Sequence, residues 1–121
     1  MNNHQWQPGQ RARVTRAYTA QYADPIAFRA GDRLIVGAND TEWPAFVCCT
    51  GPDGRSGWTP DRLIERDRAG GVARADYSAL ELTVVAGETV TILEEEGGWI
   101  RVTNSAGATG WVPVEHFSPA L

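Results

Sequence analysis

An internal duplication constrains the fold of this chain more than any other feature of its sequence. Three pieces recur in the same order, with offsets of 59, 56 and 53 residues: Tyr18 matches Tyr77, residues 30–43 match 86–99, and residues 57–60 match 110–113. The offset changes between matched pieces, which places the missing residues in surface loops, where length changes are tolerated. The sequence therefore predicts one structural unit that occurs twice.

Each copy of the repeat consists of short β-type runs separated by turn signals. Val, Ile, Leu and Thr fill the runs, as at 33–36 and 89–93, while Gly, Pro, Asp and Asn mark the turns, as at 51–54 and 104–107. No segment of about 11 residues has convincing helical periodicity. These patterns predict an all-β protein.

The chain length of 121 residues leaves room for two very small domains. We expect a first barrel at 1–66, with a polar N-terminal tail at 1–9, and a second barrel at 67–121. A short polar connector at about 65–71 is expected to join them, with Gly70 and Gly71 as its hinge.

The matched pieces form an ordered set of motifs in each copy. They are an opening Tyr, an apolar-x-apolar-x-x-Gly-acid turn, an alternating strand, a Trp and a closing Gly-Trp-x-Pro. They occur at Tyr18, 26–32, 34–36, Trp43 and 57–60, and again at Tyr77, 82–88, 90–92, Trp99 and 110–113. This order resembles the SH3 domain family over nearly the whole chain, as a variant in a protein expected to be bacterial. The resemblance implies two tandem SH3-like five-stranded barrels.

The resemblance also implies a binding site on each barrel. SH3 domains bind proline-rich peptides in polyproline II form between aromatic rings and a closing proline. The positions carried over are Tyr18, Trp43 and Pro60 in the first barrel, and Tyr77, Glu81, Trp99 and Pro113 in the second. Two aromatic walls of the family are replaced in each copy, by Arg16 and Leu63 and by Ala75 and His116. Both grooves are therefore expected to be partly degraded.

Acidic residues suggest what the second groove would prefer. Glu81 stands where the family places a carboxylate that pairs with a ligand Arg, and Glu94–Glu96 follow in the next loop. Residues 1–66 carry a net charge of +1 and residues 67–121 a net charge of −5. A proline-rich or basic peptide is the expected partner, and a merely solvated acidic loop is the alternative. The pI of about 5.1 argues against nucleic acid.

No motif indicates catalysis, a cofactor or a metal. Cys48 and Cys49 are adjacent and are read as two strand residues, one pointing inward and one outward, and His4 and His116 stand in no recognisable catalytic motif. No apolar stretch approaches the roughly 18 residues of a membrane span, and no signal sequence is visible. We expect a cytoplasmic, non-enzymatic protein without a membrane partner.

Three functions remain open from the sequence. The first is an adaptor that binds a protein or peptide through two SH3-like domains. The second is a structural or assembly protein whose groove faces are buried between the domains or in a homo-oligomer. The third is a cell-wall or carbohydrate-binding SH3-like module.

Overall fold

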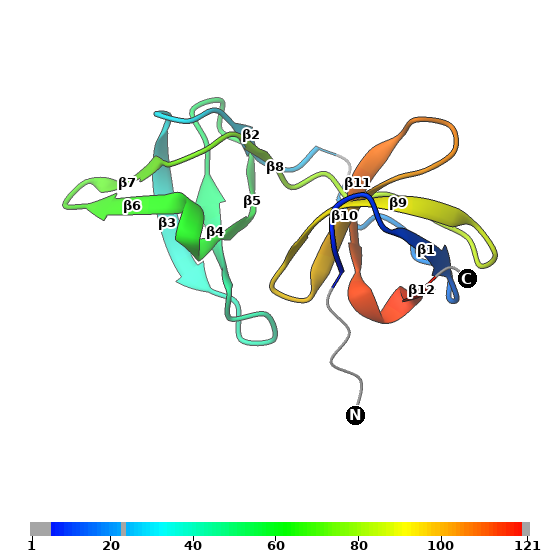
Figure 1. Cartoon of the computed structure of the whole chain (residues 1–121). Helices are drawn as coiled ribbons and strands as arrows, with labels where there is room; N and C mark the ends of the chain where they lie inside the picture. Colours follow the sequence, from blue (N-terminus) through cyan, green and yellow to red (C-terminus); the bar gives the residue numbers. More distant parts are fainter. Residues whose placement is uncertain (1–5, 23, 120–121) are drawn as a thin grey trace. The chain divides into compact units, whose positions relative to one another are not determined.

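The computed structural model describes residues 6–22 and 24–119 and is all-β. Within these residues the chain forms twelve strands and two short 3₁₀ helices (Figure 1). Ten of the strands form two five-stranded antiparallel sheets, and the other two form a small ladder. The predicted fold class, an all-β chain with two five-stranded SH3-like units, is confirmed.

Unit 1 consists of residues 1–21 together with 81–121. Its sheet has the order β11-β10-β9-β1-β12, and no ladder among the described residues joins the edge strands, so the sheet is open. A 3₁₀ helix (Val114–His116) precedes the last strand. The strands are β1 (Arg11–Val14), β9 (Thr89–Glu96), β10 (Trp99–Thr103), β11 (Thr109–Pro113) and β12 (Phe117–Pro119).

Unit 2 is the contiguous segment 22–80, and its sheet has the equivalent order β5-β4-β3-β7-β6. Its 3₁₀ helix spans Asp61–Leu63. A two-stranded ladder pairs β2 (Ala27–Phe28) with β8 (Tyr77–Ser78). The sheet strands are β3 (Arg33–Asn39), β4 (Phe46–Thr50), β5 (Ser56–Pro60), β6 (Ile64–Asp67) and β7 (Gly70–Ala73).

The two copies of the repeat exchange their first strands. In Figure 1 the dark blue strand β1 lies among the yellow-to-red strands of unit 1, where Ala12 pairs with Val90 and Arg13 with Ser118. In unit 2 the equivalent place, between β3 and β6, is taken by β7, which is the first strand of the second copy of the repeat. The chain therefore passes from one unit to the other at 21/22 and again at 80/81.

This pairing corrects the predicted division into 1–66 and 67–121. Segment 65–71 is not a connector, because β6 and β7 form a hairpin through it. Gly70 is not a hinge between domains but part of β7, with φ of 130°. A Cβ atom added there would lie 2.7 Å from the Leu34 carbonyl oxygen, so only glycine fits this strand contact.

The exchange is possible because the two first strands are equivalent in the repeat. In unit 1 the Val14 N–H donates to the Glu88 oxygen at 2.8 Å, and the Gly87 N–H donates to the Val14 oxygen at 2.8 Å. In unit 2 Ala73 makes the same pair of bonds, with Asp32 at 2.9 Å and with Gly31 at 2.8 Å. Either strand therefore meets the same backbone pattern in either sheet.

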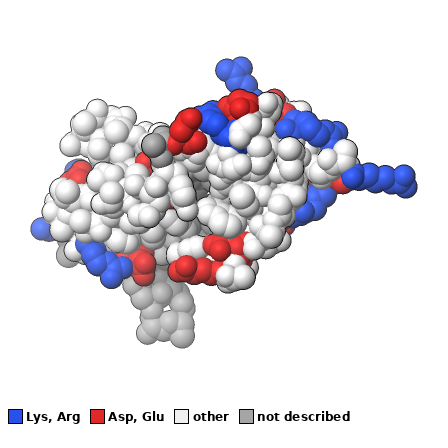
Figure 2. Space-filling model, turned by 180° about the vertical axis from the view of Figure 1, so that it is seen from behind, with Lys and Arg blue, Asp and Glu red and all other residues white. Residues whose placement is uncertain are grey.

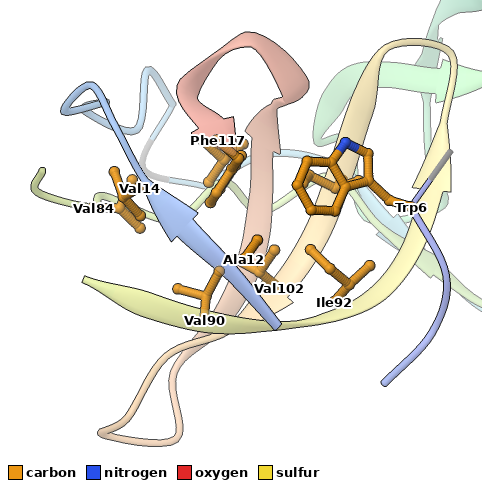
Figure 3. Packing of buried hydrophobic residues seen from close by; sticks show 10 residues of the cluster. Trp6, Ala12, Val14, Val84, Val90, Ile92, Val102 and Phe117 are labelled. Atoms are coloured by element: carbon orange, nitrogen blue, oxygen red, sulfur yellow. The ribbon is translucent and has the colours of Figure 1, made fainter. Parts of the chain in front are cut away.

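The core of unit 1 includes a residue from the segment expected to be a polar tail. Trp6 is only 8% exposed, and its ring meets that of Phe117 edge-on at 6.4 Å. Figure 3 shows the indole pointing into the cluster with Ile92. Gly9 and Gln10 hold the segment in place through backbone bonds of 2.8 Å to Ile92. Residues 6–9 are thus part of unit 1, and residues 1–5 lie outside the described residues.

The core of unit 2 is smaller and follows the same alternation of buried and exposed positions. The buried residues that pack together are Ile26, Phe28, Leu34, Val47, Cys49, Ile64 and Ala73. Gly57 lets β5 approach Ile26, because an added Cβ atom would lie 2.8 Å from the Ile26 side chain. Cys49 is 1% exposed and Cys48 is half-buried, as expected for neighbours that point to opposite faces of a strand.

The predicted charge imbalance disappears once the residues are assigned to the folded units. Unit 1 contains four Arg and six acidic residues, and unit 2 contains seven Arg and nine acidic residues. Each unit therefore has a net charge of −2. Figure 2 shows red and blue side chains scattered among large uncharged areas on one face. The two halves of the sequence therefore differ in net charge, whereas the two folded units do not.

The exchange predicts which fragment of the chain folds alone. Fragment 22–80 contains all five strands of its sheet, whereas fragment 1–66 lacks β7 and fragment 67–121 lacks β1. We expect 22–80 to unfold cooperatively on heating, followed by circular dichroism, and fragment 81–121, which contains neither β1 nor β7, to lack a transition. A folded 1–66 beside an unfolded 22–80 would instead support the tandem division.

The packing of Trp6 predicts a large loss of stability when it is truncated. Trp6→Ala should lower the free energy of unfolding by about 3 kcal/mol, the usual cost of removing a buried aromatic ring. Gln7→Ala, at the exposed neighbouring position, is the matched control and should change little. Urea denaturation of the full chain measures both, and equal midpoints would show that the Trp6 ring does not stabilise unit 1.

Replacement of the buried Thr59 by valine is expected to stabilise the protein. Its side-chain oxygen is buried, and among the described residues the weakly polar thiol of Cys49 is its one neighbouring hydrogen-bonding group. The equivalent position in unit 1 is Val112. Thr59→Val should raise the free energy of unfolding by about 1 kcal/mol, because it removes a buried hydroxyl that has only a weak thiol beside it. Val112→Thr should have the opposite effect, and a loss of stability in both variants would refute the explanation.

Candidate functional site

Unit 1 brings three rings together from separate parts of the chain. Tyr18 follows β1, Trp99 begins β10, and His116 ends the 3₁₀ helix. The Tyr18 ring lies edge-on to Trp99 at 6.0 Å and to His116 at 5.1 Å. Pro113 is the cross-strand partner of Trp99. Tyr18 and Trp99 are half-buried, so their rings form part of the surface. We call the partly exposed Tyr18 and Trp99, with the buried Pro113 and His116 beside them, the Tyr18–Trp99 surface.

Hydrogen bonds fix the positions of these rings. Tyr18 exchanges backbone bonds of 3.0 and 2.9 Å with Val84. The Nδ1 atom of His116 lies 2.9 Å from the Arg16 carbonyl oxygen, and because that oxygen only accepts, Nδ1 carries the hydrogen. The His116 carbonyl in turn accepts from the Thr15 N–H at 2.8 Å. The segment after β1 is therefore tied to the 3₁₀ helix on both sides of the His116 ring.

Glu81 acts within the site as a positioning group. Its Oε1 atom accepts from the Tyr18 hydroxyl at 2.7 Å and from the Gln21 N–H at 2.8 Å. Hydrogen bonds to a carboxylate are among the stronger ones in proteins. Glu81 therefore holds Tyr18 and the end of the N-terminal segment in place. Its predicted role, pairing with a ligand arginine, would have to share this oxygen.

The acidic loop expected to form a rim has partners inside the chain. Glu94 lies 2.7 Å from Arg101 on the neighbouring strand. The Glu95 carboxylate accepts from the backbone N–H of Trp6 at 3.1 Å. These two carboxylates therefore serve the sheet and the N-terminal segment, so less negative charge is available for a basic ligand than the sequence suggests.

The structure regroups the residues predicted to bind a ligand. Tyr18 was expected beside Trp43 and Pro60, and Tyr77 beside Glu81, Trp99 and Pro113. Because the first strands are exchanged, Tyr18 instead joins Glu81, Trp99 and Pro113 in unit 1. Tyr77, Trp43 and Pro60 belong to unit 2. The predicted residues are thus partly brought together, but in different sets.

Unit 2 does not repeat the arrangement of unit 1. Tyr77 packs against Phe28 at 5.5 Å, and its hydroxyl donates to the Trp58 carbonyl oxygen at 2.9 Å. Phe46 pairs with Pro60 as Trp99 pairs with Pro113, and it is 6% exposed. The position equivalent to Trp99 is therefore a buried Phe.

Trp43 is not the structural equivalent of Trp99. It lies before β4, in the loop that follows β3, and its backbone N–H donates to the Asp40 side chain at 3.2 Å. Sequence alignment paired the two tryptophans at an offset of 56, whereas the strands pair at an offset of 53. The length difference thus falls before β4. The closing motifs at 57–60 and 110–113 already differ by 53 residues, and the same offset applied to Trp99 predicts Phe46 as the partner of Pro60.

The remaining titratable groups do not define a second site. Burial raises the pKa of the Cys49 thiol, which keeps it protonated at neutral pH. Within residues 6–22 and 24–119, no three His, Cys, Asp or Glu side chains are placed to hold a metal ion. In the same part of the chain, no helix is long and apolar enough to cross a membrane.

Comparison with known families agrees with this architecture. Residues 82–118 match the family described as bacterial SH3 domain. The chain therefore contains a bacterial SH3 domain in unit 1. The second five-stranded sheet, with its equivalent strand order, suggests another SH3-like domain in unit 2. The matched span holds Trp99, Pro113 and His116, while β1 and Tyr18 lie outside it. A search of curated proteins finds no match to the chain.

Proposed function

We propose that this chain is a non-enzymatic protein that binds a peptide or protein segment through the Tyr18–Trp99 surface of unit 1. The observation that carries the proposal is the half-buried pair of rings, Tyr18 against Trp99, with the buried Pro113 as the cross-strand neighbour of Trp99. Tryptophan at such a position commonly contributes a large share of binding energy. The hydrogen bonds around Tyr18 and His116 support the proposal, because a rigid surface loses little entropy on binding.

The chemistry of this surface favours an apolar, proline-rich ligand. The two half-buried rings, set edge-on, leave apolar faces against which a polyproline II segment packs. Glu81 and Glu94 are engaged by donors of the chain itself. We infer that ring contacts provide most of the affinity and that any basic residue of the ligand adds a smaller, salt-dependent contribution.

Unit 2 is proposed to have a structural role. The residue equivalent to Trp99 is the buried Phe46, and the Tyr77 hydroxyl is bonded to a backbone carbonyl. Both rings thus contribute to packing within the unit. This observation favours the view that unit 2 supports the fold and that one binding surface serves the chain.

The proposal predicts a difference between two tryptophan variants. Trp99→Ala should weaken binding of a proline-rich peptide by roughly thirtyfold, the effect of losing about 2 kcal/mol of contact energy. Trp43→Ala, at the residue that the sequence repeat matches to Trp99, is the control and should leave affinity nearly unchanged. Fluorescence anisotropy with labelled peptides, one neutral and one containing arginine, measures both at low and high salt.

Circular dichroism of each variant separates lost binding from lost folding. Glu81→Gln keeps an acceptor for Tyr18 and should reduce affinity for the neutral and the arginine-containing peptide to a similar, small extent. A folded Trp99→Ala variant with unchanged affinity would move binding away from the Tyr18–Trp99 surface. A stronger effect of Trp43→Ala would place the binding surface in unit 2.

A further inference from the structure

Residues 6–21 of unit 1, here called the arm, contact the other segment of that unit, residues 81–119, from one end of the arm to the other. Besides the ladders of β1, the arm makes backbone bonds of 2.8 Å from Gly9 to Ile92, 2.8 Å from Thr15 to His116 and 3.0 Å from Tyr18 to Val84. At its end, the Ala20 N–H donates to the Thr83 hydroxyl at 3.0 Å. All of these partners lie between residues 81 and 119.

The arm fills a place that the rest of unit 1 cannot fill. It supplies β1, the strand between β9 and β12, so that residues 81–119 alone would leave these two strands unjoined. It also supplies three buried core residues, Trp6, Ala12 and Val14, which are 8%, 0% and 1% exposed. Without the arm, unit 1 presents two strand edges and an uncovered apolar core. A strand that carries matching apolar residues is the chemistry that this surface accepts.

The arm is joined to the rest of the chain by one passage, at 21/22. Unit 2 is contiguous, and its sheet contains no residue of the arm. A change in the path of the chain at 21/22 therefore alters no strand of unit 2. An identical arm from a second copy would make every bond that the chain's own arm makes, since only the connection differs.

We propose that the arm is exchangeable and that two copies of this chain associate reciprocally, each arm completing unit 1 of the other copy. The repeat already shows that a first strand leaves its own copy and pairs in the other sheet. In the exchanged dimer the Tyr18–Trp99 surface is shared between chains. One copy supplies Tyr18 and Gln21, and the other supplies Glu81, Trp99 and His116. This association is independent of the proposed peptide ligand.

Concentration decides between the closed monomer and the dimer. The Gln21 N–H lies 2.8 Å from Glu81, so the end of the chain's own arm and the start of residues 81–119 are held side by side at the two ends of unit 2. This proximity within one chain gives an effective concentration of about 1 mM, so the monomer prevails in dilute solution. The dimer is expected when chains refold together at comparable concentration, and it then persists because its release requires unfolding of unit 1.

The test uses disulfide trapping across the ladder between the arm and β12. Arg13 and Ser118 are register partners, and both side chains lie on the solvent side of the sheet. Arg13→Cys and Ser118→Cys are made as two separate full-length variants, each with Cys48→Ser and Cys49→Val, the latter matching Val102 of unit 1. The two variants are unfolded, mixed, refolded at high and at low concentration, and oxidised. A 13–118 disulfide between chains, identified by mass spectrometry, reports exchange.

Two controls make every outcome decisive. The double variant Arg13→Cys with Ser118→Cys must form the link within one chain, which verifies the geometry; if it does not, Arg11 and Thr91, also register partners, replace the pair. Glu65→Cys and Val72→Cys, partners in the β6–β7 hairpin, serve as a pair from unit 2 and should not link between chains. A concentration-dependent 13–118 link without a 65–72 link supports the proposal. Its absence at about 1 mM, where intermolecular closure competes, overturns the proposal.

Discussion

The backbone ladders that β1 makes with β9 and β12 are the interaction on which unit 1 depends. Without β1 the sheet has two unpaired strand edges and an uncovered core, and neither is stable in water. The same strand leads directly into the segment that carries Tyr18. Pairing of β1 therefore builds the sheet and positions one of the two half-buried rings of the candidate site.

Local structure could be predicted from the sequence, but strand partners could not. Alternation predicted the buried positions Leu34, Val90 and Ile92, and adjacent thiols on opposite faces, because these properties depend on residues that are neighbours in the chain. Pairing of β1 depends on a choice between two sheets with equivalent edges. The duplication that identified the fold is thus also what concealed the connectivity, since Val14 and Ala73 fit the same hydrogen-bonding pattern.

The candidate site shows the same limit at the level of single residues. Trp99 and Pro113 were found by their motifs, and they lie together because both belong to the same contiguous hairpin. Trp43 was misassigned because a gap in a loop is invisible when two tryptophans can be aligned. The roles of Glu81 and Trp6 depend on contacts with residues 63 and 111 positions away along the chain, respectively, and no local pattern reports such contacts.

The double passage of the chain between units has a consequence for synthesis on the ribosome. Translation proceeds from the N-terminus, so the arm emerges first, yet its partner β12 ends only at Pro119. Residues 22–80 are complete well before then and have all the strands of their own sheet. Throughout this interval Trp6 and Val14 have no core to enter, as is typical of nascent segments that chaperones protect from aggregation. The arm is thus made before residues 22–80 and buried after them.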